Sequence, residues 1–227
     1  MAKTNDHVTQ LANHFERAIL AGEIAAGDLL PSERHISAEM GVSRSVVREA
    51  LGRLASLGLV RSQHGSGTRV EAPSSRQVTV GYQRLLRRVD VKLEDLAAVR
   101  LPLETTIAAL AAQHRTDRHL RQLVDAQKLL ARKRGTLETQ VQADVDFHAV
   151  LADATGNSLF GTVLAPIQEL LIESRRRTLG RYGVEIAHEH HAVILDAVRA
   201  ADPDAAAAAM RRHLEANFQH LAAEPRK

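Results

Sequence analysis

The chain has 227 residues, of which 44% are hydrophobic and 25% charged, so it is long enough for two packed domains and is not a disordered polypeptide. It contains no cysteine, which excludes disulfides, thiolate metal sites and thiol catalysis, and its aromatic share of only 3% favours cores of Leu, Val, Ile and Ala between packed helices. The net charge of +3 identifies no partner by itself.

The first 72 residues have the pattern of a helix, a helix-turn-helix and a β-hairpin. Apolar residues at helical spacing predict helices over 6–22, 32–40 and 43–58, with glycines at their ends and serines at the start of the second and third. Two short runs with strand composition, 59–63 and 68–71, flank His64-Gly65-Ser66-Gly67, which predicts a hairpin. Elements in this order form a winged helix-turn-helix domain, assigned here to residues 1–72.

The rest of the chain shows helical periodicity alone. Ala72-Pro73-Ser74-Ser75 has linker composition, and we place a linker at 73–79 and a second domain at 80–227. Helices are predicted over 76–88, 92–113, 117–134, 136–153, 157–179, 184–200 and 203–222. The predicted fold class is mainly α, with an N-terminal winged helix-turn-helix domain and a C-terminal all-α helical bundle.

No part of the chain has the apolar pattern of a signal peptide or a membrane span. The N-terminal residues lack an apolar core, and no run approaches the ~18 apolar residues that a span requires. We therefore expect a cytoplasmic protein that has no membrane partner.

Arginines gather in the predicted helix-turn-helix and hairpin. Six arginines lie between residues 34 and 69 against two glutamates, although residues 1–72 as a whole are neutral. Arg44 opens the second helix of the turn motif and Arg48 follows one turn later, so both can present paired donors to base edges in a major groove. Ser43 and Ser45 can donate hydroxyls to phosphate at the positive end of that helix, and Arg34 opens the preceding helix. The alternative is that these charges merely solvate exposed helix faces.

An ordered set of segments over residues 8–71 resembles the GntR family of bacterial regulators. The segments are Gly27-Asp28-Leu29-Leu30-Pro31-Ser32-Glu33-Arg34, Gly41-Val42-Ser43-Arg44-Ser45-Val46-Val47-Arg48-Glu49-Ala50-Leu51, Gly58-Leu59-Val60 and His64-Gly65-Ser66-Gly67-Thr68-Arg69-Val70. The resemblance implies that Arg34, Arg44 and Arg48 read a short palindromic operator, while His64 and Gly65 at the wing tip approach the minor groove. Val46 departs from the Thr or Pro common in relatives, which removes a possible phosphate contact.

Four polar residues of the second domain stand where helical periodicity calls for apolar side chains. Asp144 and His148 lie one turn apart on an otherwise apolar stripe, a spacing that lets both bind one ion. His191 and His213 occupy similar stripes on two later helices, and the four groups could converge on a metal. A single histidine on such a stripe is more often a satisfied core residue. Spacing also leaves His188, His190 and His191 open as alternatives.

Residues 92–222 resemble the FCD effector domain of the FadR-like subfamily of GntR regulators. The resemblance rests on three segments, Asp144-Val145-Asp146-Phe147-His148, His191-Ala192-Val193-Ile194-Leu195-Asp196-Ala197 and Met210-Arg211-Arg212-His213-Leu214. It implies that Asp144, His148, His191 and His213 bind a divalent metal. Oxygen and imidazole donors without thiolate fit Zn, which we take as the expected ion, and also Ni or Mn.

Arg100 is a charged residue on the apolar stripe of the helix predicted at 92–113. A guanidinium inside a bundle needs an anionic partner, and Glu104 one turn away is the partner available within the chain. The FCD resemblance implies instead that Arg100 contacts the carboxylate of an effector. The expected effectors are small organic or sugar acids that bind at the metal.

These patterns together predict a sequence-specific transcriptional regulator, a repressor that binds double-stranded DNA as a homodimer and responds to a carboxylate effector. Three histidines and a carboxylate also occur in metal hydrolases, but no general base with a motif accompanies them here, so we do not expect an enzyme. A constitutive architectural DNA binder with a purely structural metal uses the same residues. The inward Arg100 is the main feature against that alternative.

Overall fold

The computed structural model describes residues 2–63, 66–72, 74, 76–86 and 92–222. They form two compact units that divide between Gln77 and Val78, and each is described by itself. No helix among the described residues is long and apolar enough to cross a membrane.

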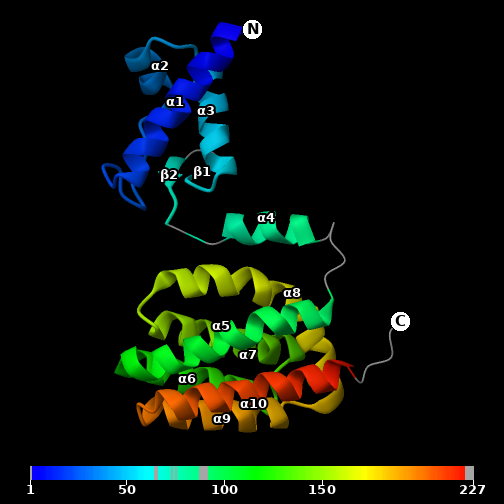
Figure 1. The fold of residues 1–227 in the computed structure, drawn as a ribbon. Helices are drawn as coiled ribbons and strands as arrows, with labels where there is room; N and C mark the ends of the chain where they lie inside the picture. The colour runs from blue at the N-terminus through cyan, green and yellow to red at the C-terminus, as the bar shows by residue number, and fades with distance from the viewer. Residues whose placement is uncertain (1, 64–65, 73, 75, 87–91, 223–227) are drawn as a thin grey trace. The chain divides into compact units, whose positions relative to one another are not determined.

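The N-terminal unit contains three helices, α1 (Ala2–Leu20), α2 (Glu33–Met40) and α3 (Arg44–Ser56) (Figure 1). Local sequence sets the bounds of the last two. The Ser32 hydroxyl accepts a hydrogen bond from the His35 backbone N–H at 3.2 Å and so caps α2. Gly41 ends that helix in the left-handed conformation at φ 63°, which a residue without a Cβ adopts at little cost. Ser43 then caps α3, so a turn of three residues separates the two helices.

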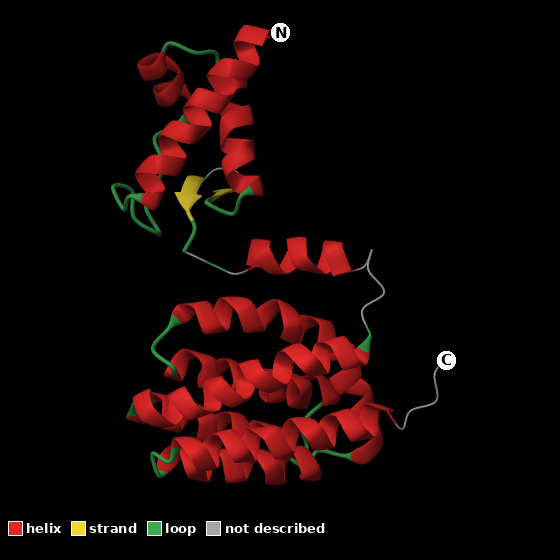
Figure 2. Cartoon of the chain, in the orientation of Figure 1, coloured by secondary structure: helices red, strands yellow, loops and turns green. Residues whose placement is uncertain are grey.

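The wing is a two-stranded antiparallel hairpin, β1 (Val60–Gln63) and β2 (Gly67–Val70), in which Val60 pairs with Val70 (Figure 2). The backbone N–H of Leu30 donates to the Thr68 carbonyl at 2.8 Å, which ties the chain before α2 to the wing. The inner faces of helices and wing share one core, built from Val8, Leu11, Ala12, Phe15, Leu30, Ile36, Val46, Val47, Ala50, Leu51, Leu54, Val60 and Val70. The winged helix-turn-helix prediction is confirmed.

The C-terminal unit is a bundle of long helices (Figures 1 and 2). Its elements are α5 (Leu93–His114), α6 (Asp117–Leu130), α7 (Leu137–Ala154), α8 (Ser158–Tyr182), α9 (Glu185–Arg199) and α10 (Pro203–Ala222), preceded by α4 (Arg76–Leu86). Helix α10 packs along both α5 and α9, and α7 lies between α6 and α8. The bundle core is aliphatic, as the low aromatic content predicts, with Phe147 its largest fully buried side chain.

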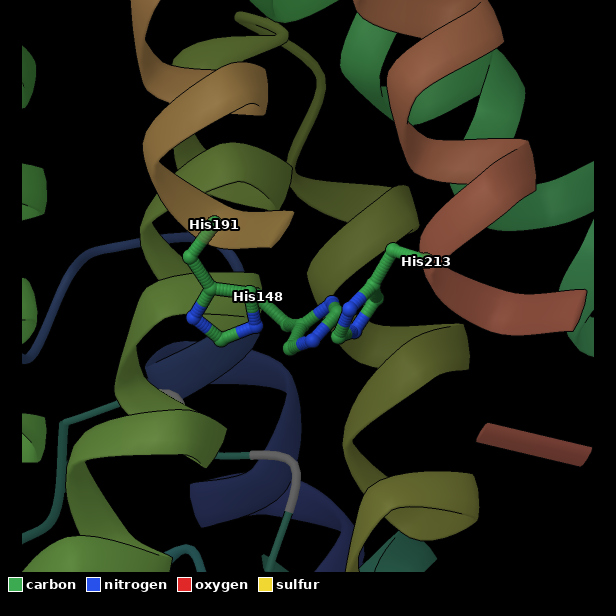
Figure 3. Close-up of side chains that lie close together, drawn as sticks. All are labelled: His148, His191 and His213. Atoms are coloured by element: carbon green, nitrogen blue, oxygen red, sulfur yellow. The ribbon is translucent and has the colours of Figure 1, made fainter. Parts of the chain in front are cut away.

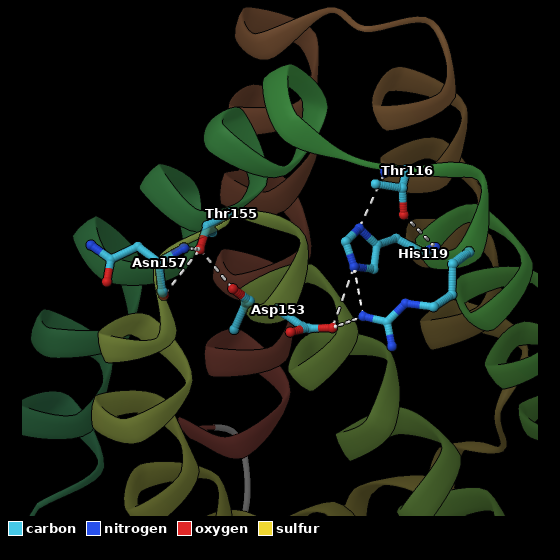
Figure 4. A network of polar contacts seen from close by, with 7 residues as sticks. Thr116, His119, Asp153, Thr155 and Asn157 are labelled. Atoms are coloured by element: carbon cyan, nitrogen blue, oxygen red, sulfur yellow. Dashed lines mark hydrogen bonds and ion pairs between the residues drawn. The ribbon is translucent and has the colours of Figure 1, made fainter. Parts of the chain in front are cut away.

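A polar network closes the corner at which α6 begins and α7 ends (Figure 4). The buried ring of His119 accepts the Thr116 backbone N–H at its Nδ1 (3.2 Å), and its Nε2 lies 3.3 Å from Asp153 Oδ2. Arg118 also donates to Asp153, at 2.7 Å. These contacts explain why a histidine is buried here without any link to the candidate metal site, which lies elsewhere in the bundle.

Some helix ends differ from the sequence-based bounds. Helix α6 ends at Leu130 rather than 134, because the chain turns there and the Gly135 N–H bonds to the Arg132 carbonyl. Helix α4 does begin at Arg76, the predicted first residue of the helix at 76–88, so its first residues lie within 73–79, where we placed the linker. Helix α9 ends at Arg199 rather than 200, and Ala201 beyond it is exposed and adopts the left-handed conformation at φ 59°.

Candidate functional site

Three histidines from three helices meet inside the C-terminal unit. His148 of α7, His191 of α9 and His213 of α10 are each at most 1% exposed, and Figure 3 shows their rings turned toward one another. One nitrogen from each ring lies within 4.8 Å of the others. The cluster joins elements 65 positions apart in the sequence, so only the folded bundle assembles it.

The surroundings keep the imidazoles of His191 and His213 uncharged. Phe147 stacks on the His191 ring at 4.0 Å between centroids. Burial lowers the pKa of His191 to about 3, against the opposing effect of Asp144. Burial also lowers the pKa of His213 well below its usual value, as do His191 and His148 beside it. A neutral imidazole keeps a lone pair, which is the form that binds a metal ion.

Glu104 on α5 connects the cluster to Arg100. One carboxylate oxygen lies 2.5 Å from His148 Nδ1, and the other lies 2.6 Å from Arg100 Nε. Burial opposes ionisation of Glu104, but Arg100 and His148 outweigh it and hold the pKa of this carboxyl well below its usual range. A carboxylate this close to Nδ1 leaves the other nitrogen of His148 available as a ligand. Sequence reasoning considered Glu104 only as a partner of Arg100.

Asp144 lies beside the histidine cluster. Its Oδ1 is 3.5 Å from His191 Nε2, and its Oδ2 forms an ion pair with Arg175 Nε of α8 at 2.5 Å. Burial opposes ionisation, but Arg175 and then His191 lower the pKa of Asp144, so it is a carboxylate. Asp144 is not among the three residues whose ligand atoms all lie within 4.8 Å of one another.

The donor set fits a divalent metal ion. His148 Nε2 and both ring nitrogens of His191 are buried without a hydrogen-bond partner among the described residues, which is costly unless another group binds them. Two ligands about 2.1 Å from one tetrahedral ion lie about 3.4 Å apart, close to the separation of His191 Nε2 and Asp144 Oδ1. Imidazoles with a carboxylate suit Zn, Ni and Mn alike.

A small cavity of about 30 Å³ adjoins the cluster, and both Arg100 and Asp144 line it. Its other polar lining residues, which sequence reasoning did not place at the site, are Ser174, Arg175, Thr178 and Asn217. Asn217 Nδ2 lies 3.1 Å from His213 Nε2, so it connects the cavity to the cluster. Arg100 is 3% exposed and its Nη2 has no acceptor within the described chain, even though Glu104 binds its Nε.

The residues predicted to read DNA form an exposed group at the helix-turn-helix. Arg44 and Arg48 on α3 both approach Glu33 Oε2 of α2, at 3.8 and 2.8 Å, and their side chains are 60% and 65% exposed. The hydroxyls of Ser43 and Ser45 lie 2.8 Å apart at the exposed start of α3. Both arginines and both serines therefore present free surface around one helix N-terminus.

The structure places most of the remaining residues that the sequence analysis singled out. Arg34 is exposed as the second residue of α2, whereas His64 and Gly65 lie outside the described residues. Val46 is buried in the core of the winged unit, so this side chain packs rather than facing a phosphate. Of the histidines left open on α9, it is His191 that belongs to the buried cluster, while the His190 ring is 5.8 Å from that of His213.

Comparisons with known proteins assign both units. Residues 8–70 match the family model described as bacterial regulatory proteins, gntR family, and residues 95–216 match the FCD domain. The chain is 35% identical over 201 residues to the HTH-type transcriptional regulator LutR of Bacillus subtilis, covering 85% of this chain and 91% of the relative. It is 32% identical over 206 residues to the HTH-type transcriptional repressor NanR of Salmonella newport, covering 88% of this chain and 79% of that relative.

A solved structure agrees with these relatives. The GntR protein of Streptococcus agalactiae superposes with a TM-score of 0.70 at 28% identity, over 93% of this chain and 99% of that one. The predicted family, the fold class and the expectation of a regulator rather than a metalloenzyme are therefore confirmed. This chain belongs to the GntR family of bacterial transcriptional regulators, in the FadR-like subfamily that carries a C-terminal FCD domain.

Proposed function

We propose that this regulator is a repressor whose affinity for its operator changes when a small carboxylate binds at a metal ion in the helical unit. The observation that carries the proposal is the buried cluster of His148, His191 and His213, in which one ring nitrogen of each residue lies within 4.8 Å of the others. NanR, a relative that spans most of this chain, is named a repressor. DNA is the partner, and we infer that the protein acts in the cytoplasm, where bacterial DNA lies.

The proposed ion is Zn, with Ni or Mn as alternatives, held by the three histidines and Asp144. Such an ion supplies positive charge that attracts a carboxylate. Arg100 supplies a second group that can bind the acid, because its Nη2 is buried and has no acceptor among the described residues. The proposed effector is an organic or sugar acid that spans the two. Operator release follows only if the acid binds one conformation of the protein more tightly than the other.

The test is a thermal-shift screen of organic and sugar acids on the metal-loaded protein. We expect a cognate acid to stabilise the loaded protein, and chelation or His148→Ala to remove that stabilisation. Arg100→Ala should weaken the response while leaving metal content intact. The exposed His114→Ala serves as a matched control and should behave as the wild type. If the acid stabilised the chelated protein equally and left DNA binding unchanged, a structural metal in an architectural DNA binder would replace this function.

We further propose that the regulator acts as a homodimer. A palindromic operator needs two reading heads related by a two-fold axis, and one winged helix covers one half-site. Sedimentation at micromolar concentration should therefore give twice the monomer mass of 24.8 kDa, and two chains should bind each full operator. A monomer that binds a full operator as one chain would contradict this expectation.

A further inference from the structure

A second buried guanidinium, that of Arg175, lines the same cavity as Arg100. Its side chain lies deep in the bundle at 9% residue exposure, with Nε on Asp144 and Nη1 donating to the Gln168 carbonyl at 3.3 Å. Its Nη2 is buried and has no acceptor among the described residues. Arg100 shows the same arrangement, since Glu104 binds its Nε and its Nη2 has no acceptor there. Two arginines that line one cavity thus each have a buried donor without a partner among the described residues.

The charges around this cavity can be counted. Glu104 neutralises Arg100 and Asp144 neutralises Arg175, because each carboxylate forms an ion pair with its arginine. The three histidines contribute no charge when their lone pairs bind an ion. A divalent ion therefore leaves this buried region with two positive charges that no described side chain compensates. Uncompensated charge is costly away from water, so a ligand with two negative charges suits the region better than one with a single charge.

The size of the cavity limits the ligand. A volume of about 30 Å³ corresponds to roughly two water molecules, so the cavity has room for one carboxylate group of a ligand whose other end lies at the metal, and Leu171 and Leu179 form part of its wall. A long acyl chain would require these side chains and their helix to move. Ser174, Thr178 and Asn217 are the uncharged polar residues among those that line it. The cavity therefore favours a compact, strongly charged ligand.

We infer that the effector of this regulator is a short dicarboxylate, with one carboxylate at the metal and the second bound by the Nη2 groups of Arg100 and Arg175. The inference rests on the proposed metal-dependent function and narrows its ligand class. Arg175 is then a specificity residue. Its charge decides whether a ligand with two negative charges or one with a single charge neutralises the buried positive charge. Charge-assisted hydrogen bonds from a planar guanidinium are the interactions that select a carboxylate.

The experiment compares acids that differ by one charge at nearly constant size. Calorimetric titration of the metal-loaded full chain would use malonate with its mono-amide and succinate with its mono-amide, at fixed ionic strength. We expect at least one diacid to bind about tenfold or more tightly than its mono-amide, since one charge-assisted contact is lost with each amide. A smaller ratio for both pairs overturns the dicarboxylate but leaves a carboxylate effector standing. If none of the four acids binds, the short dicarboxylate is likewise overturned, and the screen of other acids then decides the proposed function separately.

A variant series tests the role of Arg175. In Arg175→Gln the positive excess falls from two charges to one, so the preference for the diacid should drop below tenfold while metal content is retained. The exposed neighbour Arg177 does not line the cavity, so Arg177→Gln should keep the preference of the wild type. An unchanged preference in Arg175→Gln overturns the role of Arg175. If loss of the partner of Asp144 prevents folding, which circular dichroism would show, the wild-type comparison still decides the ligand class.

Discussion

Arg44 and Arg48 share a single acidic partner, Glu33, on the exposed side of the helix-turn-helix. Exposed pairs of this kind contribute little to stability, so Glu33 does not prevent the arginines from exchanging it for DNA. Its effect is to hold both side chains near one point before DNA arrives. The specificity of the protein should therefore depend on the arginines, and its fold should not.

We predict that Arg44→Ala reduces discrimination between operator and scrambled DNA by about 1 to 3 kcal/mol, because a bidentate contact with a base is lost. Residual binding should remain salt-dependent. A mobility-shift titration measures both, using an operator selected from random DNA by the wild-type protein. Arg53→Ala, in the last turn of the same helix, is the control. Unchanged discrimination in Arg44→Ala would show that this residue reads no base.

Glu104 should govern metal affinity although it is not itself placed as a ligand. We predict that Glu104→Gln lowers the affinity for the metal by about 10- to 100-fold, because the amide orients His148 less well than a carboxylate. Competition with a coloured chelator measures the affinity. Glu138→Gln removes a carboxylate that is 65% exposed on the same helix as His148, and it should leave the affinity unchanged. Equal affinities in the wild type and Glu104→Gln would reject a positioning role.

Sequence patterns located the histidines but only part of their surroundings. Asp144, His148, His191 and His213 interrupt apolar stripes, and that exception is visible without a structure. Arg175 is a further charged residue on a partly apolar stripe, which it shares with Leu164, Leu171 and Leu179, but it stands in the run Arg175-Arg176-Arg177, a composition typical of an exposed basic segment. The contact between Glu104 and His148 crosses two helices. Helical periodicity predicts which side of each helix faces the core. It cannot predict which residues of two different helices then contact each other.

At the scale of the elements, the caps decide where helices end, and one cap is made with an unfavourable residue. Ala201 follows α9 at φ 59°, where the N–H of Asp202 donates to the Ala197 carbonyl at 3.1 Å and that of Ala201 to Val198 at 3.1 Å. This is the hydrogen-bond pattern of a Schellman cap, which normally uses glycine. A residue with a Cβ is strained in that conformation.

We predict that Ala201→Gly raises the free energy of unfolding by about 1 kcal/mol, because relief of strain outweighs the added freedom of the unfolded chain. The matched control is Ala208→Gly at an exposed position inside α10, which should lower the free energy of unfolding by about 1 kcal/mol. Urea unfolding followed by circular dichroism gives both values. Destabilisation by both substitutions would mean that the strain at residue 201 is negligible.

At the scale of the whole molecule, the helix bounds and order were predictable because apolar spacing, caps and glycines agree along the chain. The same low aromatic content that favoured a helical fold leaves an aliphatic core with a polar centre. That centre makes the stability of the helical unit sensitive to acid. His191 and His213 are neutral in the fold, and any unfolded chain exposes them to water.

We predict that chelated protein loses stability as the pH falls below about 6.5. Burial lowers the pKa of His191 from 6.5 to about 3, so between these values the unfolded state binds a proton that the folded state does not. The free energy of unfolding should therefore fall with pH, by up to about 1.4 kcal/mol per pH unit for each such histidine. Urea midpoints between pH 7.5 and 5 measure it. The slope should shrink in His191→Phe and persist in His35→Gln, whose side chain is exposed. Equal slopes in both variants would contradict this origin.

The order of the histidines along the chain also sets an order of events during synthesis. His148 leaves the ribosome first, His191 follows, and His213 lies in α10, the last described helix, which packs on α5 at the start of the bundle. A nascent chain that has not yet completed α10 contains His148 and His191 but lacks His213. The side of α5 on which α10 packs is then uncovered. We therefore expect the proposed ion to bind the full cluster only after α10 has packed on the bundle, and a chain that stops before α10 should not bind it with all three histidines.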